Sequence, residues 1–379
     1  MAPARRLIGQ LRRSAHLGLA LLRTTAVRPP APLKLNLCVT YWCQYKCKTC
    51  NIWKRKPTDE LTTEELRALV RENPHVNWVD LTGGEIFLRP DIDEIFEAIL
   101  TGWSRLALLH FPTNGFQTDR IVASVERIAR HRAAAQTVVT VSLDGDEALN
   151  DEIRGIKGGF RRQIATFKAL RRIPGIVTAL GMTLSTYNLE KFGETFAACA
   201  RECPGLTVGD LHLNVAQKSG HYYANAEMDA VAPDPAAARA EIAKYRALRA
   251  MPRTPSQFLE NAYLRNLDTF LATGRTPMPC HALRASCFID PWGVVYPCIA
   301  YSKPLGRLRE TGMRLEPIWV AAETAQLQGE IWQGNCPNCW TACEAYQSIL
   351  GNTLAIRRRP ATVGPIAGPE QPAAVGPVR

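Results

Sequence analysis

The sequence lacks any run of apolar residues long enough to cross a bilayer, which excludes an integral membrane protein. Its composition also excludes collagen and coiled-coil classes. Residues 5–22 combine Arg with a short Leu-rich stretch but lack an A-x-A-like cleavage site, so we do not expect a secretory signal. With 46% hydrophobic and 21% charged residues, the 379-residue chain can build one large domain and a smaller one.

Excess positive charge is almost absent from the central part of the chain, although the formal net charge is +11. Residues 1–30 contain Arg but no acidic residue, and residues 351–379 also carry a net positive charge. The segment between them is therefore close to neutral. A basic groove across the folded body is not expected, and nucleic acid is not an expected partner.

The cysteines are not spread along the chain as they are in a small disulfide scaffold. Nine of the twelve fall in two groups, which is typical of metal binding in a reducing compartment. Cys199 and Cys203 are four residues apart on a predicted helix, where packed thiols are the expected interpretation.

Residues 4–23 are predicted to form a basic amphipathic helix. Its predicted apolar face carries Leu7, Ile8, Leu11, Ala15, Leu19 and Leu22, and its polar face carries Arg5, Arg6, Arg12, Arg13, His16 and Arg23. This pattern has two interpretations: the helix lies on an anionic membrane surface, or it packs against the folded body. The Pro-rich segment up to residue 32 then acts as a stiff connector.

From residue 34 the chain alternates between strand and helix patterns about six times, which predicts a parallel sheet. We predict an α/β fold: a partial (β/α)6 barrel of the TIM type over residues 33–225, with a small Cys-rich α+β module at 278–350. Residues 226–277 form a helical linker, and residues 351–379 form a disordered tail. The polar and Gly-rich motifs all follow predicted strands, where parallel α/β folds place their sites. Within this pattern, Thr62 with Glu65 predicts a capping box, and Asp91 is expected to cap a helix.

The first cysteine group has the spacing Cys-x3-Cys-x2-Cys directly after the first strand, at Cys43, Cys47 and Cys50. Three thiolates this close can hold three corners of a cubane cluster and leave one iron open. The alternative is a zinc knuckle, which usually needs a fourth ligand.

This arrangement resembles the radical S-adenosylmethionine (SAM) enzymes, whose cysteine triplet follows the first strand of a partial barrel. Further motifs follow the next strands: Gly83-Gly84-Glu85 after the second, Asn114 after the third, and Ser142 with Asp144 and Arg154 after the fourth. The resemblance implies that the Gly-Gly-Glu motif binds the amino group of SAM. It also implies that Ser142 and Arg154 hold the SAM carboxylate and that Asp144 lies near the ribose. A guanidinium suits this role because it binds a carboxylate with two prongs.

The resemblance further implies the chemistry, which belongs to the cofactors. A reduced [4Fe–4S] cluster, held by three Cys and by SAM, would cleave SAM to a 5′-deoxyadenosyl radical that abstracts hydrogen from a substrate. A reductant such as ferredoxin or flavodoxin would supply the electron.

The second cysteine group comprises Cys280, Cys287, Cys298, Cys336, Cys339 and Cys343, with a hairpin turn predicted at residues 291–293. It resembles the SPASM and twitch modules of radical SAM enzymes, which bind auxiliary [4Fe–4S] clusters. Here the final Cys run is short, so one auxiliary cluster is predicted. Its ligands would be Cys280, Cys298, Cys336 and Cys339, or else Cys280, Cys287, Cys298 and Cys343. A zinc site with the same thiolates is the alternative.

The sequence does not define the substrate. One hypothesis is a peptide or protein maturase. A second is a small-molecule or lipid modifier, held at the membrane through residues 4–23. A third is an iron–sulfur or zinc module without catalytic activity. The expected location is the cytoplasm, with peripheral contact at the inner membrane face under the second hypothesis. Residues 221–223 follow the sixth strand, where they either line the pocket or form an ordinary loop.

Overall fold

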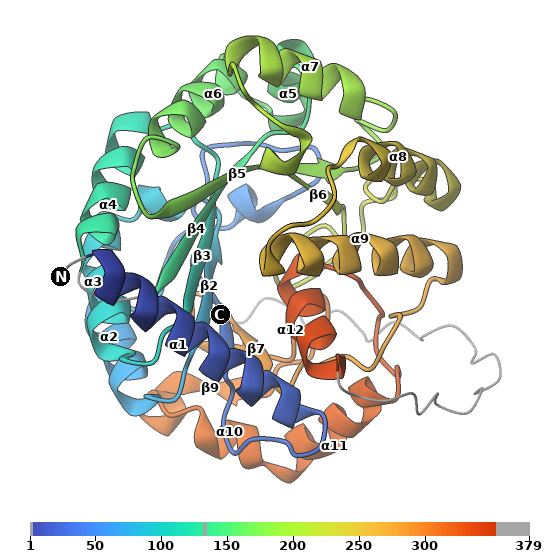
Figure 1. Ribbon diagram of the computed structural model, residues 1–379. Helices are drawn as coiled ribbons and strands as arrows, with labels where there is room; N and C mark the ends of the chain where they lie inside the picture. The colour runs from blue at the N-terminus through green and yellow to red at the C-terminus, as the bar shows by residue number, and fades with distance from the viewer. Residues whose placement is uncertain (1–2, 132–134, 354–379) are drawn as a thin grey trace.

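One nine-stranded sheet organises the computed structural model, which describes residues 3–131 and 135–353. Six strands pair in parallel in the order β6-β5-β4-β3-β2-β1, as the predicted repeats required. Their bounds are β1 Lys34–Thr40, β2 Trp78–Gly83, β3 Leu108–Thr113, β4 Gln136–Ser142, β5 Ile176–Leu184 and β6 Leu211–Val215. The sheet curves without closing (Figure 1), so the prediction of a partial barrel is confirmed.

Helices cover the outer face of this curved sheet (Figure 1). They are α2 Thr63–Glu72, α3 Ile92–Gly102, α4 Thr118–Arg130, α5 Glu147–Arg154, α6 Gly159–Leu170 and α7 Phe192–Glu202. The predicted capping box of Thr62 and Glu65 starts α2. Asp91 occupies the predicted N-cap position of α3, but the expected side-chain cap is absent, because its carboxylate binds Arg89 at 2.7 Å and the hydroxyl of Thr63 instead of a backbone amide.

The Cys-rich segment continues the barrel sheet. Its first strand, β7 (Ser286–Ile289), pairs in parallel with β1, and the antiparallel strands β8 (Val294–Tyr296) and β9 (Gly306–Arg307) follow. The hairpin turn falls where it was predicted, because the side chain of Asp290 accepts the backbone amides of Trp292 and Val294. The remaining helices of this segment are α10 Glu316–Val320, α11 Ala322–Trp332 and α12 Ala342–Asn352. Because it shares one sheet with the barrel, the auxiliary module is held rigidly beside β1.

The open side of the barrel is filled by α9 (Pro255–Thr273) and α12, which pack together, with α8 (Pro235–Leu248) against α9. A buried ion pair lies between α12 and the sheet: the ammonium of Lys34 is 2.7 Å from the carboxylate of Asp80, and the Lys34 side chain is fully buried. Lys34 also donates to the side chain of Gln347 on α12. This network joins the first two strands to the helix that fills the barrel.

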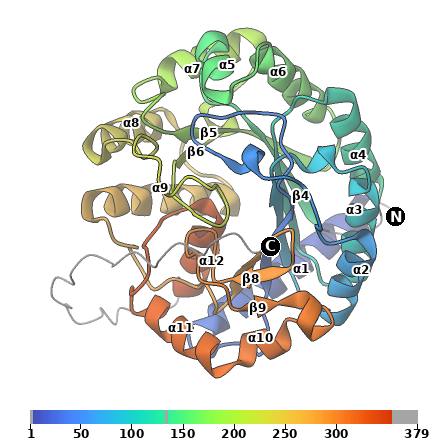
Figure 2. The ribbon, with the colours of Figure 1, turned by 180° about the vertical axis from the view of Figure 1, so that it is seen from behind.

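Helix α1 (Pro3–Thr24) crosses the amino-terminal ends of the strands, in front of the barrel in Figure 1 and behind it in Figure 2. It packs through Leu17 and Leu21, both buried in a cluster with Trp78 and Ala107. The predicted apolar face is therefore not the buried face: Ile8, Leu11 and Leu19 are 51%, 62% and 49% exposed. The predicted tail from residue 354 onward lies outside the described residues.

Candidate functional site

The first cysteine group occupies a loop at the carboxyl end of β1, braced from several sides. The backbone amide of Tyr41 donates to Glu60 at 2.8 Å, and the Tyr41 hydroxyl donates to the carbonyl of His221 at 2.7 Å. At the other end of the loop, the amide of Lys48 donates to the carbonyl of Ile153 on α5. These contacts hold the loop against β1, α5 and the segment that follows β6.

The three thiols of this loop are half-buried and influence one another. Burial and the nearby Cys47 thiol raise the pKa of Cys43 to about 12, and burial together with the charges of Cys47 and Cys43 raises the pKa of Cys50. The structure thus brings the predicted triplet together. Among the described residues, no three His, Cys, Asp or Glu side chains converge on a point suited to a single metal ion. A cubane does not require such convergence, because each of its thiolates binds a different iron.

Gly83 and Gly84 allow the end of β2 to approach the cysteine loop. A Cβ on Gly84 would lie 2.3 Å from the carbonyl oxygen of Trp42 and 2.8 Å from the Cβ of Cys43. The amides of Gly84 and Glu85 donate to the carbonyls of Thr40 and Trp42, each at 2.8 Å. The Gly-Gly pair is therefore needed to seat the cysteine loop on the sheet edge.

Glu85 fastens the end of β2 to the end of β3. Its carboxylate accepts the Thr113 hydroxyl at 2.9 Å and the backbone amides of Asn114 and Phe87 at 2.6 Å and 3.3 Å. Burial raises the pKa of Glu85 to about 7, against the effect of these hydrogen bonds. Since a carboxylate has about four acceptor positions, at most one remains for the ammonium group of a ligand.

Asn114 lies next to the cysteine loop. Its amide nitrogen is 4.0 Å from the sulfur of Cys43 and donates to the side chain of Gln44 at 3.1 Å, while its oxygen accepts the amide of Phe116. A donor facing a thiolate stabilises the negative charge on sulfur, so Asn114 is placed to tune a cluster bound there.

Arg154 and Asp144 form a buried pair beside the same loop, at 2.8 Å. The second oxygen of Asp144 accepts the backbone amide of Thr183 at 2.9 Å, so both carboxylate oxygens are engaged within the protein. In contrast, the Nε atom of Arg154 and the hydroxyl of Tyr45 are buried without a hydrogen-bond partner. Buried polar groups rarely stay unsatisfied, so these two donors fit an anionic ligand that binds at this position.

Burial is the largest cause that raises the pKa of the cysteines in the second group. Glu344 and Cys339 also raise the pKa of Cys280, Cys339 and Glu344 raise that of Cys298, and burial with the charges of Cys336 and Glu344 raises that of Cys339 to about 12. Glu344 also acts on Cys287 on β7 and, together with Asp80 and Lys34, on Cys343 on α12. The choice between the two predicted ligand sets stays a prediction.

Tyr223 lies between the two cysteine groups. Its carbonyl accepts the amide of Asn51 at 2.9 Å, and burial, followed by the charges of Cys343, Cys50 and Cys339, raises the pKa of its phenol. The neighbouring His221 is stacked on Tyr296 with ring centroids 4.2 Å apart. Residues 221–223 form turns beside the first cysteine group, and whether they line a substrate pocket stays a prediction.

Sequence reasoning missed the inner face of the sheet. Along β3 to β6 the outward residues are buried under helices, while the alternating inward residues, such as His110, Thr140, Ser142 and Asn214, are partly accessible. His110 lies 3.3 Å from the carboxylate of Asp80 and 3.1 Å from the hydroxyl of Thr140. The alternation of buried and partly accessible residues along these strands was the available signal, and it marks a polar inner face of the sheet.

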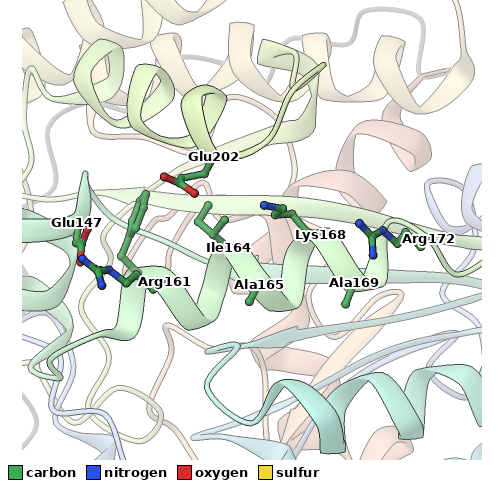
Figure 3. A pocket seen from close by; sticks show the side chains of 9 residues that line it. Glu147, Arg161, Ile164, Ala165, Lys168, Ala169, Arg172 and Glu202 are labelled. Carbon is green, nitrogen blue, oxygen red and sulfur yellow. The ribbon is translucent and has the colours of Figure 1, made fainter.

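A surface hollow of about 520 Å³ lies elsewhere, on the outside of the barrel. Figure 3 shows it between α6 and α7, lined by Arg161, Lys168, Arg172 and Glu202 among others. Arg161 is paired with Glu147 at 2.6 Å. The hollow includes no residue of either cysteine group, so it is not part of the candidate site.

Two family models match the chain. Residues 37–199 match the radical SAM superfamily, and residues 280–340 match the iron–sulfur cluster-binding domain SPASM. The chain therefore carries a radical SAM domain over residues 37–199. It also carries an iron–sulfur cluster-binding domain of the SPASM type over residues 280–340. Radical SAM domains bind a [4Fe–4S] cluster and SAM, and SPASM domains bind auxiliary iron–sulfur clusters, so the predicted kinds of cofactor are confirmed.

Curated relatives match part of the chain. The AdoMet-dependent heme synthase of Methanosarcina barkeri is 30% identical over 171 residues, which are 44% of this chain and 46% of that protein. The sporulation killing factor maturation protein SkfB of Bacillus subtilis is 28% identical over 175 residues, 45% of this chain and 40% of that protein. The chain thus aligns with less than half the length of these relatives.

Solved structures share the fold. SuiB of Streptococcus suis bound to SAM matches with a TM-score of 0.56 and 16% identity, over 79% of this chain and 68% of that chain. The structure of anSMEcpe with bound AdoMet also matches with a TM-score of 0.56, at 13% identity, over 85% of this chain and 97% of that chain. SuiB bound to its precursor peptide SuiA matches with a TM-score of 0.55 at 17% identity, over 83% of this chain and 70% of that chain.

Proposed function

We propose that the chain is a radical SAM maturase that modifies a peptide. The observation that carries the proposal is the cysteine loop at the carboxyl end of β1, beside an inner face of the sheet whose polar side chains are partly accessible. Relatives named as peptide maturation proteins support it, SkfB among them, as does the likeness in fold to SuiB with its precursor peptide.

Cys43, Cys47 and Cys50 would hold the catalytic cluster, with SAM beside it. When bound, the two cofactors supply a 5′-deoxyadenosyl radical that removes hydrogen from the substrate. Arg154 would bind the SAM carboxylate through its free Nε atom, together with Ser142. Asp144 would hold Arg154 in place, and the acceptor positions that remain on its two carboxylate oxygens would contact the ribose. Glu85, with the backbone of Gly83 and Gly84, stays the candidate for the SAM amino group.

Cys280, Cys298, Cys336 and Cys339 would hold one auxiliary cluster. The test is the iron content of two matched variants after anaerobic reconstitution. Cys336→Ser should lose about four irons per chain, whereas Cys287→Ser should keep them, because Cys287 packs in the apolar core. Equal iron loss in both variants would contradict this ligand set.

Two further parts of the proposal concern the electron donor and the cellular compartment. A low-potential one-electron donor such as ferredoxin or flavodoxin would reduce the catalytic cluster. The described cysteines are all free thiols, which suits a reducing compartment such as the cytoplasm. Among the helices of the described residues, none is both long and apolar enough to cross a bilayer.

The substrate class can be tested with peptides encoded by small reading frames beside the gene. The reconstituted full chain is incubated anaerobically with SAM, dithionite and each synthetic peptide, and peptide masses and 5′-deoxyadenosine are measured. The proposal expects a mass change in one peptide that depends on SAM and is lost when Cys43, Cys47 and Cys50 are all replaced by Ala. If SAM is cleaved and no peptide changes mass, the peptide assignment is wrong.

A second candidate function is modification of a tetrapyrrole. It rests on the relative named as a heme synthase, which is 30% identical over the aligned segment. The same assay with a haem-precursor tetrapyrrole in place of the peptide separates the two. A SAM-dependent mass change of the tetrapyrrole alone would favour this second function.

A further inference from the structure

Helix α1 is firmly docked on the barrel through only one of its faces. Leu17 is 7% exposed and Leu21 is fully buried against the strand ends. The carbonyls of Thr24 and Thr25 accept the guanidinium of Arg284, and the side chain of Gln10 reaches the carbonyl of Ala135. The helix is thus part of the folded body, and its orientation fixes which residues face outward.

The outward face of α1 carries an apolar stripe. Ile8, Leu11 and Leu19 are each about half exposed or more, and Ala15 is exposed between them. At 100° per residue these positions fall within one arc of the helix. Ten large apolar side chains are exposed in the described chain, and three of them lie on this one helix. Such a concentration marks an interaction surface.

The charge around the stripe is positive. The sequence of α1 contains five Arg and no acidic residue, and the exposed side chains of Arg12 and Arg23 lie along one edge of the stripe. Loops at the same end of the barrel add exposed Arg105, Arg171 and Arg172. A second copy of this face would bring like charges together. Nucleic acid would pair with the Arg side chains but would leave the apolar stripe uncovered. An anionic lipid surface satisfies both features.

We propose that the outward face of α1 binds an anionic lipid bilayer, with Ile8, Leu11 and Leu19 in the interface and Arg12 and Arg23 among the headgroups. The cysteine loop follows the carboxyl end of β1, whereas α1 crosses the amino ends of the strands. A chain bound in this way holds its cysteine loop away from the membrane, so its substrate arrives from the aqueous side.

Sedimentation with lipid vesicles tests this without any enzyme activity. The full chain is mixed with vesicles of phosphatidylcholine alone or with about 30% phosphatidylglycerol, a fraction that gives the negative surface potential basic helices respond to. The wild type should bind the anionic vesicles and be released at high salt. The double variant Leu11→Ser, Leu19→Ser should bind at least about tenfold more weakly, because two half-buried leucines no longer enter the interface.

Two further variants separate the causes. Arg12→Gln with Arg23→Gln should weaken binding to anionic vesicles about tenfold or more, while binding to phosphatidylcholine alone stays unchanged. Leu248→Ser is the matched control, because Leu248 is 59% exposed on α8, and it should bind as the wild type does. The proposal fails if the wild type does not bind anionic vesicles, or if the leucine variant binds them as tightly as the wild type does. It also fails if the wild type is a dimer that the leucine variant dissociates without any vesicle binding.

Discussion

We expect substitution of Lys34 to lower the stability of the fold more than most other substitutions do. Its ammonium is fully buried, 2.7 Å from Asp80, and lies 4.2 Å above the ring of Trp78. Lys34→Met keeps most of the side-chain volume but leaves the Asp80 carboxylate buried without its counter-charge. Removing one partner of a buried ion pair costs about 3–5 kcal/mol. We therefore expect the free energy of unfolding to fall by that amount.

The assay is urea unfolding of the anaerobically reconstituted protein, followed by circular dichroism. Lys191→Met is the matched control, because Lys191 pairs with Glu194 on the surface, with both side chains about half exposed. Exposed pairs contribute about 0–1 kcal/mol, so this variant should unfold nearly as the wild type does.

The pH dependence gives a second criterion. Burial acts to raise the pKa of Asp80, but the charge of Lys34 and the hydrogen bond with His110 hold it well below its usual range. Without Lys34, burial dominates and the pKa of Asp80 rises. Protonation of Asp80 then removes its unpaired charge as the pH falls. The deficit of Lys34→Met should shrink between pH 8 and pH 5.5. A loss below about 1 kcal/mol, or a deficit independent of pH, would refute the reasoning.

Three other variants test the site and its supports. Gly84→Ala should lower the iron bound by the first cysteine group, because its Cβ would lie 2.3 Å from a carbonyl of the cysteine loop, whereas Gly193→Ala has open space and should load normally. Arg154→Lys should weaken SAM binding about 10–100-fold in calorimetry with unchanged iron content, since a lysine cannot reproduce the guanidinium fork; equal affinity would remove Arg154 from the SAM site. Burial raises the pKa of Asp290 to about 6, so the native state binds its proton more tightly and loses up to about 3 kcal/mol of stability as the pH rises from 4 to 6. Asp290→Asn should remove that slope in unfolding experiments at several pH values, and an unchanged slope would contradict it.

Local patterns predicted the barrel well, because each β-α unit carries its own periodicity and each motif follows its own strand. The parallel pairing of β7 with β1 was not predictable in this way, because it joins residues about 250 positions apart and leaves no local pattern. The cysteine triplet could be named from spacing alone. In contrast, spacing alone cannot choose between the two ligand sets of the second group, since that choice depends on which way β7, which carries Cys287, and α12, which carries Cys343, face.

Helix α1 shows the limit of amphipathic patterns most clearly. The pattern suggested that its widest apolar arc would be the buried face. In the structure, the neighbouring arc, which carries Leu17 and Leu21, packs against the barrel instead. A helical pattern reports that a face is apolar, but tertiary contacts decide whether protein or another surface covers it. Asp91 is a similar case, because a nearby Arg89 competes successfully with the helix amides for its carboxylate.

The most direct test of the account is SAM cleavage by the anaerobically reconstituted chain. Iron and sulfide are quantified, dithionite and SAM are added, and 5′-deoxyadenosine is measured. We predict about eight irons per chain and SAM cleavage that is lost when Cys43, Cys47 and Cys50 are replaced by Ala. About four irons with cleavage intact would remove the auxiliary cluster from the account. A chain that binds no iron and cleaves no SAM would contradict it altogether.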